Sequence, residues 1–596
     1  MMALAHLNKY FWKYKWRFLL GIIFVVISNV FSLVPARMVR EGFNTVSKAI
    51  EHFQTNALRA DVGDLQKTLL TYGLIVIGTA LAQGIFMFFM RQTIIVMSRF
   101  IEFDLKNEIF QQYQALTIAF YKRNSTGDLM NRISEDVSQV RMYIGPAIMY
   151  SINVLSQLIL VIGSMLFVNV ELTIYALLPM PILSVAIYYV SKEINVRSEQ
   201  VQRQLSNLST FVQENFSGIR ILKSYARERS SAQDFDKEAL EYRDRSLDLV
   251  KVNALFFPLM ILLIGLSTLL TIYIGGRLAI EGTITTGNIA EFVIYVNMLT
   301  WPVASLGWVT SIVQRAAASQ KRINEFLHLE PEIRNPTLED TPILGAISFK
   351  DVSFTYPDSG IKALSNINFN IAPGQSLAIV GKTGSGKSTV AHLIGRLYDP
   401  TSGEIRIDER PLENINLKNL RSSIGYVPQE GYLFSDTIAR NIAFGLDEYD
   451  HERIEQAAQD ADVLHNILDF PKQFETRVGE RGVILSGGQK QRVSIARAII
   501  VNPTILIFDD CLSAVDTQTE ETILQNLKRV MKDRTTVIIS HRVSSVKHAD
   551  QIIVLSNGSI IERGDHQSLL EQKGYYADLY EQQLLEEQES SSANRS

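Results

Sequence analysis

Long apolar segments fill roughly the first half of the chain. Six of them are apolar over about 20 residues with few charges, the length that a helix needs to cross a bilayer. They lie near residues 18–36, 68–90, 144–168, 172–191, 253–275 and 289–312. The pattern predicts an all-α transmembrane domain of six long helices, whose two ends lie on the same side of the membrane.

The second half has a different pattern, in which short apolar strands alternate with amphipathic helices. That alternation is typical of an α/β domain. A chain of 596 residues is also too long for a single core. We expect a multidomain protein with a transmembrane domain at 1–325, a proline-bearing linker at 326–345, an α/β domain at 346–585 and a polar tail at 586–596.

Two of the connections between the spans are long. The second-to-third and fourth-to-fifth links run for dozens of residues with much helix-forming charge, so each is expected to be two helices with a turn. A helix of about 22 residues would project roughly 30 Å beyond the bilayer. The turns are placed within 121–137 and 211–228, where Gly127 and Gly218 break the helical pattern. Solvated coiled stalks are the alternative.

The opening segment HLNKYFWKYKWRF interleaves basic and aromatic residues, as an interfacial helix on the cytoplasmic face does. A signal peptide is the alternative, but no small-x-small cleavage site follows it. We therefore expect a multi-pass protein of the cytoplasmic (inner) membrane, with both termini and the α/β domain in the cytoplasm.

Composition narrows the range of partners. The formal net charge is −4 and the basic residues form no concentrated stripe, so nucleic acid is not an expected partner. The single cysteine, Cys511, excludes an intrachain disulfide. The spans contain few ionisable residues, which argues against the proton relay of a secondary transporter. Such apolar spans suit a hydrophobic or amphipathic substrate and the lipid bilayer around them.

A phosphate-binding loop follows the predicted strand SLAIVG. Its glycines let successive backbone N–H groups point at phosphate oxygens, and the helix that follows adds its positive end. Lys387 is expected to reach the β- and γ-phosphates and the Ser388 hydroxyl to meet Mg²⁺. The sequence thus predicts ATP and Mg²⁺ as cofactors, held by Gly381, Lys382, Thr383, Gly384, Ser385, Gly386, Lys387, Ser388 and Thr389.

A second apolar strand, ILIF from Ile505, delivers two adjacent carboxylates. The first, Asp509, is expected on the magnesium side of the site, as in other phosphate-loop ATPases. The second, Asp510, has no role that the strand pattern alone explains.

Further motifs of the second half resemble those of ATP-binding cassette (ABC) proteins. They are LSGGQ beginning at Leu485, an isolated histidine after TVIIS, and the segments VSFTYP, YVPQEGYLF and RVGERG. TGDLMNRISEDV, ENFSGIRILK and the six spans resemble the exporter-type membrane domain of the same superfamily. The resemblance covers nearly the whole chain and implies a multidrug- or lipid-exporter-like half-transporter with an α/β P-loop ATPase domain.

The resemblance also implies roles for single residues. Tyr356 would stack on adenine, His541 would contact the γ-phosphate, and Asp516 would lie in the loop that links two nucleotide sites. Asp510 takes the position at which the family usually has a glutamate that orients or deprotonates the attacking water. The implied catalytic residues are Asp510, His541 and Gln429, and the implied metal ligands are Ser388, Gln429 and Asp509.

In this family ATP lies between the phosphate loop of one cassette and the LSGGQ of another, so the resemblance implies a dimer with a second half-transporter. The residues facing the γ-phosphate across that interface would be Ser486, Gly487, Gly488 and Gln489. A serine and two glycines that open a helix do form a phosphate cradle; an ordinary helix cap is the alternative. The aspartate at 510 favours a heterodimer and the retained His541 a homodimer, so both stay open.

The favoured function is ATP-driven export by alternating access of a lipid, drug or peptide. An ATP-gated channel or a regulatory subunit with an impaired site is the alternative, because Asp510 is one methylene, about 1.3 Å, shorter than glutamate. We expect normal ATP binding and slow hydrolysis, unless the backbone compensates for the shorter side chain. Six spans exclude a soluble cassette protein that acts on DNA or ribosomes, and the fusion of membrane and ATPase parts disfavours an importer.

Overall fold

The structure is a computed structural model that describes residues 2–55, 62–337, 339–511 and 517–593. The chain divides into two compact units. The first contains Met1–Gln114 and Gly127–Leu329, and the second contains Ala115–Thr126 and Glu330–Ser596. Each unit is described by itself below.

The described part of the first unit holds six helices that are long and apolar enough to cross a membrane, as predicted. Each predicted span lies within one of them. Four of the six are single helices: α2 (Lys15–Thr55), α3 (Val62–Ala115), α11 (Glu228–Ile280) and α12 (Thr286–Leu327). The third span, Thr126–Val168, includes α5 (Thr126–Asn131), α6 (Val137–Met142) and α7 (Ile148–Val168). The fourth consists of α8 (Val170–Leu177) and α9 (Pro179–Ser217).

These helices bury one stripe and expose another. Phe292, Tyr295 and Val296 of α12 are fully buried against side chains of α2, α7 and α8. Large apolar side chains such as Phe167 and Ile280 are instead almost fully exposed. An apolar outer surface has no reason to form in water but fits a lipid environment, where tails are as apolar as leucine. The chain is therefore a multi-pass membrane protein.

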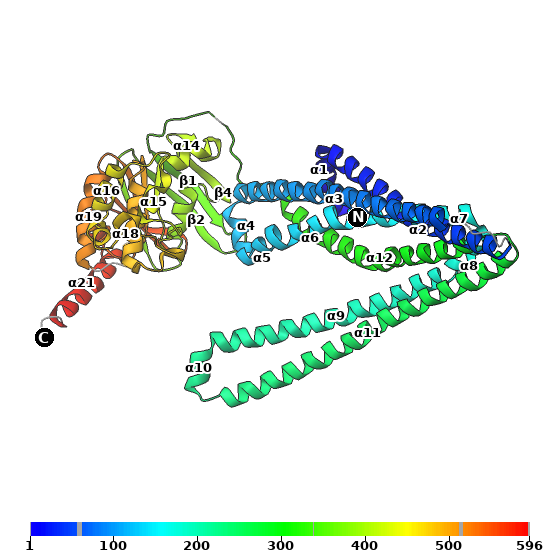
Figure 1. The fold of residues 1–596 in the computed structure, drawn as a ribbon. Coiled ribbons are helices and arrows are strands. Elements are labelled where there is room, and N and C mark those ends of the chain that lie inside the picture. Colours follow the sequence, from blue (N-terminus) through cyan, green and yellow to red (C-terminus); the bar gives the residue numbers. More distant parts are fainter. Residues whose placement is uncertain (1, 56–61, 338, 512–516, 594–596) are drawn as a thin grey trace. The chain divides into compact units, whose positions relative to one another are not determined.

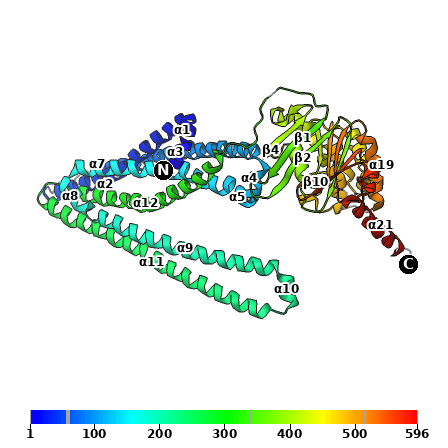
Figure 2. The same ribbon diagram turned by 180° about the vertical axis from the view of Figure 1, so that it is seen from behind.

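The long links between spans are continuous helices rather than irregular stalks. Figures 1 and 2 show α9 and α11 side by side over their length, joined at the tip by the short α10 (Ile219–Ser224). Gly218 caps the C-terminus of α9 there, so the predicted break is confirmed. The other predicted break is wrong in detail: Gly127 lies inside α5, and the chain turns at Asn124–Ser125. A glycine is tolerated in a first turn because its entropic cost weighs mainly in a helix interior.

The second unit is built on two sheets. The four-stranded antiparallel sheet has the order β2-β1-β4-β5, and the six-stranded sheet has the order β10-β9-β3-β8-β7-β6. Strands β9, β3, β8, β7 and β6 are parallel to one another, and β10 is antiparallel to β9. The bounds are β1 (Ile347–Thr355), β2 (Lys362–Ile371), β3 (Ser376–Gly381), β4 (Ser402–Ile407), β5 (Arg410–Pro411), β6 (Ile424–Val427), β7 (Ile505–Asp509), β8 (Thr535–Ile539), β9 (Gln551–Ser556) and β10 (Ser559–Gly564).

Helices cover both faces of the six-stranded sheet, which explains why its strands are apolar without alternation. Leu377 and Ile379 of β3 pack into one buried cluster, and Ala378 and Val380 into another on the opposite face. The helices are α13 (Lys387–Ile394), α14 (Leu417–Ser422), α15 (Ile438–Ile442), α16 (His451–Asp460), α17 (Leu464–Leu468), α18 (Gly487–Ile499), α19 (Thr517–Met531), α20 (His566–Glu571) and α21 (Tyr575–Ala593).

One short helix between the second and third spans belongs to the second unit. In α4 (Ile118–Arg123), Ala119 is fully buried in the cluster that contains Ile347 and Leu377. Arg123 forms an ion pair of 2.7 Å with Glu332. A single domain boundary near 325 therefore does not describe the packing, because residues 115–126 pack with the α/β domain.

Candidate nucleotide and magnesium site

The phosphate loop joins β3 to α13 in a conformation that needs its glycines. Gly381, Gly384 and Gly386 have φ values of 152°, 81° and 101°. A Cβ on Gly381 would lie 2.2 Å from the carbonyl oxygen of Leu555, and one on Gly386 would lie 2.4 Å from that of Ala363. The predicted strand, loop and helix are thus present, with the loop curled as a cradle at the N-terminus of α13.

Two polar side chains of this loop, those of Lys387 and Ser385, are turned toward its interior. Lys387 donates through Nζ to the carbonyl oxygens of Gly381 and Lys382, at 2.8 and 2.9 Å. Burial lowers the pKa of Lys387. The hydroxyl of Ser385 is buried and has no hydrogen-bond partner. A half-buried ammonium and an orphaned hydroxyl in a glycine-rich loop at a helix N-terminus fit a bound phosphate.

Two of the three expected metal ligands, Ser388 and Asp509, meet beside this loop. Ser388 donates through Oγ to Oδ1 of Asp509 at 2.8 Å, and the hydroxyl of Tyr426 donates to Oδ2 at 3.3 Å. Burial raises the pKa of Asp509, so a cation at this point would favour its ionised form. No cluster of three or more His, Cys, Asp or Glu suited to a metal occurs among the described residues. The pair fits Mg²⁺, which binds through one or two carboxylates together with phosphates and water.

The three predicted catalytic residues lie together next to Asp509. Nδ1 of His541 donates to Oδ1 of Asp510 at 2.8 Å. Gln429 approaches Oδ2 of Asp510 through Nε2 at 3.5 Å, the outer limit of a hydrogen bond. Asp510 has a φ of 48°, a left-handed conformation that aspartate tolerates better than most residues. Its backbone N–H donates to the carbonyl of Ile539 at 2.8 Å, which ties Asp510 to the end of β8.

The sheet topology explains why residues so far apart in sequence meet. Gln429 follows β6, Asp509 ends β7, His541 follows β8 and the phosphate loop follows β3. These four strands are adjacent and parallel, so their carboxyl ends lie along one edge of the sheet. Open α/β sheets bind their ligands at that edge.

Tyr356 lies outside this group, directly after β1. Its hydroxyl is 3.0 Å from Oγ1 of Thr389 in α13, and its ring packs edge to face on Tyr398. The ammonium of Lys122 in α4 lies 4.7 Å from the centre of the same ring. Tyr356 is thus connected both to the phosphate-loop helix and to α4.

The signature residues form a helix cap of their own. Ser486 accepts through Oγ from the N–H of Gln489 at 3.3 Å, and Gln489 accepts through Oε1 from the N–H of Ser486 at 3.0 Å. Ser486 and Gly487 are exposed, and a Cβ on Gly487 would meet nothing within 4 Å. The surface beside Gly487 is therefore open. Asp516, and the loop that contains it, lie outside the described residues.

Sequence reasoning missed three residues that hold the site. Tyr426 contacts Asp509 as described above. Gln491, which is buried, donates through Nε2 to the carbonyl of Pro428 at 2.9 Å and fixes the segment that carries Gln429. Gln583 contacts the backbone beside His541. Tyr426 lies within the quoted YVPQEGYLF and Gln491 lies two residues after LSGGQ, so their closeness to predicted site residues was a usable signal. Gln583 offers no such signal.

Parallel strands that bring a phosphate loop, a buried aspartate and a carboxylate–histidine pair to one edge of a sheet define a nucleotide-binding domain. Its fusion to six membrane-spanning helices defines the class of ATP-dependent membrane transport proteins. Comparison with known families agrees. A family model of the ABC transporter transmembrane region matches residues 18–303, and one described as ABC transporter matches residues 364–513.

Known proteins resemble the chain over its full length. The probable multidrug resistance ABC transporter ATP-binding/permease protein YheI of Bacillus subtilis (strain 168) is 34% identical over 98% of this chain and 98% of its own. The multidrug resistance-like ATP-binding protein MdlA of Escherichia coli (strain K12) is 35% identical over 98% of this chain and 97% of its own. The chain belongs to the ABC transporter family, with its transmembrane and ATP-binding regions fused.

The chain also resembles a lipid flippase in sequence and a solved exporter in structure. The ATP-dependent lipid A-core flippase of Pseudomonas fluorescens (strain Pf0-1) is 36% identical over 80% of this chain and 79% of its own. The structure of a bacterial Atm1-family ABC exporter with ATP bound superimposes with a TM-score of 0.77, at 25% identity, over 96% of this chain and 98% of that one. Exporters are thus the members of the family that this chain resembles.

Proposed function

We propose that the protein couples ATP hydrolysis to export of a hydrophobic or amphipathic substrate by alternating access. The observation that carries the proposal is the meeting of Lys387, Asp509 and Asp510 at one sheet edge in a chain that also supplies six membrane spans. The likeness to exporters supports the direction of transport.

The chain's own residues have separable tasks at the proposed site. Bound ATP and Mg²⁺ would supply the phosphoryl group and the charge that neutralises it. Lys387 and the loop N–H groups hold the β- and γ-phosphate end, and Ser388, Asp509 and Gln429 hold the metal. Asp510 orients or deprotonates the attacking water, and His541, fixed by Asp510 through Nδ1, would donate to a phosphate oxygen through Nε2 as an imidazolium, in which both ring nitrogens are donors.

A second half-transporter is proposed to complete the site, with Ser486–Gln489 of one chain facing the phosphate loop of the other. Two surfaces of the single chain support a dimer. In and next to α10, Phe216, Ile221 and Tyr225 are exposed, and no residue of α10 itself is buried. Such a tip has no partner among the described residues of its own unit, although it carries the apolar side chains that interfaces use.

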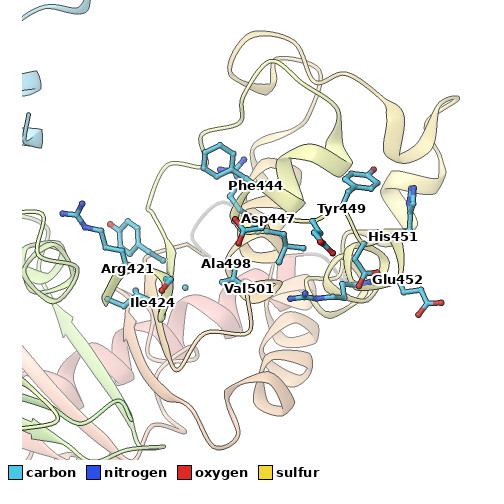
Figure 3. A pocket seen from close by; sticks show the side chains of 18 residues that line it. Arg421, Ile424, Phe444, Asp447, Tyr449, His451, Glu452, Ala498 and Val501 are labelled. Carbon is cyan, nitrogen blue, oxygen red and sulfur yellow. Dashed lines mark hydrogen bonds between the residues drawn. The ribbon is translucent and has the colours of Figure 1, made fainter. Parts of the chain in front are cut away.

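The other surface is a cavity of about 1070 Å³ in the α/β domain. Figure 3 shows Arg421 and Ile424 on one side of it and Tyr449 and Glu452 on the other. Phe444 and Tyr449 are exposed there, and the segment 447–452 contributes four carboxylates. Because α10 carries Arg220 and Lys223 beside its apolar residues, we propose that α10 of a second copy or of a homologous partner docks in this cavity.

The proposed substrate class rests on the apolar, weakly charged spans. Relatives are named for multidrug resistance and as a lipid A-core flippase, which supports a drug or a lipid as the cargo; a peptide stays a proposal from the sequence. The proposed location is the cytoplasmic (inner) membrane, with both termini and the ATPase domain in the cytoplasm. The basic and aromatic helix α1 (Asn8–Lys13), whose Lys13 pairs with Asp104 at 2.7 Å, supports this orientation.

An ATP-gated channel or a regulatory subunit is the second candidate, and the short side chain of Asp510 is the observation that favours it. Reconstitution in lipid vesicles separates the two. An exporter hydrolyses ATP faster when its substrate is added and accumulates that substrate on one side of the membrane. A channel passes solute down its gradient, and its ATPase rate does not respond to the solute. The latter result would refute export.

A further inference from the structure

The C-terminal helix α21 holds the backbone beside His541. Gln583 donates through Nε2 to the carbonyl oxygen of His541 at 2.8 Å and accepts through Oε1 from the N–H of Val543 at 2.7 Å. One amide group thus satisfies an acceptor and a donor two residues apart. These two bonds join segments about 40 residues apart in the sequence, so they reflect tertiary packing and not local helix geometry.

The same segment is held from a second side by α19. The carboxylate of Glu520, which is 2% exposed, accepts from Arg542, Ser544 and Ser545. Burial explains the bonds of Glu520, because a buried carboxylate needs partners. It does not explain Gln583, which is only partly buried and has access to water as an alternative partner.

The N-terminal half of α21 is anchored firmly enough to act as a support. Tyr576 is fully buried, and its hydroxyl is 2.8 Å from Nδ1 of His566. Glu562 of β10 accepts from the N–H groups of Tyr575 and Tyr576 at 2.6 and 3.0 Å. Gln583 lies two turns further along the same helix, so its amide is presented from a fixed platform.

We infer that Gln583 is a positioning residue, through which α21 sets the imidazole of His541 for hydrolysis; the inference rests on the proposed function of this site. The ring of His541 follows its backbone through only two side-chain torsions. Moving the carbonyl that Gln583 holds therefore moves Nδ1 relative to Asp510. A misplacement of about 1 Å in a catalytic group costs on the order of 100-fold in rate.

The test is the substitution Gln583→Met, which keeps the length of the side chain and removes both hydrogen bonds. Gln582→Met is the matched control, because Gln582 is the exposed neighbour on the same helix. We expect kcat for ATP to fall by about tenfold for Gln583→Met, with KM and the thermal unfolding midpoint unchanged, since the nucleotide-holding loop is not touched. Gln583→Glu keeps the bond to Val543 but not the one to His541, and should be equally slow.

His541→Ala and Lys387→Ala, made in the same full-length protein with any co-purifying partner, calibrate the result. The inference is overturned if Gln583→Met or Gln583→Glu keeps the wild-type kcat, if Gln582→Met is as slow, or if KM or the unfolding midpoint changes together with kcat. It is also overturned if His541→Ala leaves turnover unchanged. Failure of the proposed function looks different, because Lys387→Ala would then hydrolyse ATP as fast as the wild type.

Discussion

Lengthening the side chain at position 510 tests whether its carboxylate limits hydrolysis. In the structure Oδ2 of Asp510 is 3.5 Å from Nε2 of Gln429, a loose contact, whereas Oδ1 is 2.8 Å from Nδ1 of His541. Asp510→Glu moves the carboxylate outward by about 1.3 Å. If that distance separates the carboxylate from the attacking water, the barrier falls by at most about 2.7 kcal/mol, or roughly 100-fold in rate.

Two features of the structure reduce the gain. A longer side chain has to give up or rebuild the bond to His541. The left-handed backbone at 510, with a φ of 48°, suits aspartate better than glutamate. We therefore expect Asp510→Glu to raise the ATPase rate several-fold in a homodimer and to change it little in a heterodimer whose other site already carries the turnover. Asp510→Asn should abolish hydrolysis only in the homodimer.

The assay is phosphate release from the three proteins in lipid nanodiscs, each purified with and without a co-purifying partner. Mass measurement of each sample decides between homodimer and heterodimer. Nucleotide affinity serves as the internal control, because Asp510 does not belong to the loop that holds phosphate and all three proteins should bind ATP alike. Full turnover by Asp510→Asn in a proven homodimer would refute the catalytic role of Asp510.

Three further experiments test the nucleotide site, the ATP sandwich and the topology. Lys387→Ala should remove transport and most ATP binding, because the ammonium inside the phosphate loop has no substitute there; undiminished ATPase activity would exclude this nucleotide site. Ser486→Arg should leave a chain that binds ATP in a filter assay but does not hydrolyse it, since the arginine blocks the partner's site; normal turnover would argue against the ATP sandwich. With Cys511 replaced, cysteines at Ser217 or Thr126 should crosslink to Glu430→Cys beside Gln429, whereas a control cysteine at Asn169 should not; a crosslink to Asn169 alone would contradict the topology.

The sequence predicted those parts of the fold that depend on neighbouring residues. Six apolar runs specify six spans because each run alone meets the length that a bilayer requires. The phosphate loop is similarly local, since its glycine spacing sets positive φ at Gly384 and Gly386. The grouping of Gln429, Asp509 and His541 in one site entered only through the family resemblance, and the strand order in the structure supplies its physical basis.

The contacts that the sequence did not predict depend on distant packing. Ala119 resembles any alanine in a short helix, yet it is buried in the core of the α/β domain. Gln583 resembles any polar residue on a C-terminal helix, and only the fold places it against His541. Gly127 was misjudged for another reason: helix-breaking propensity acts mainly in the interior of a helix, and this glycine lies in a first turn.

The two turns between spans differ in their packing, and the difference suggests why a dimer would be needed to couple transport to ATP hydrolysis. The first, α4, is already packed in the unit that contains the cassette, through Ala119 and the pair Arg123–Glu332. The second, α10, has no buried residue in the described part of its own unit. The wall of the cavity proposed to receive α10 includes Tyr426, whose hydroxyl donates to Asp509. Docking of a partner's α10 would therefore act one hydrogen bond away from Asp509, so the α10 contact and the proposed magnesium site would respond to each other.

Tyr426→Phe separates docking of α10 from its effect on hydrolysis. We expect it to leave the crosslink from Ser217 intact and to weaken the dependence of hydrolysis on transported substrate. Unchanged stimulation by substrate would exclude Tyr426 as the connection.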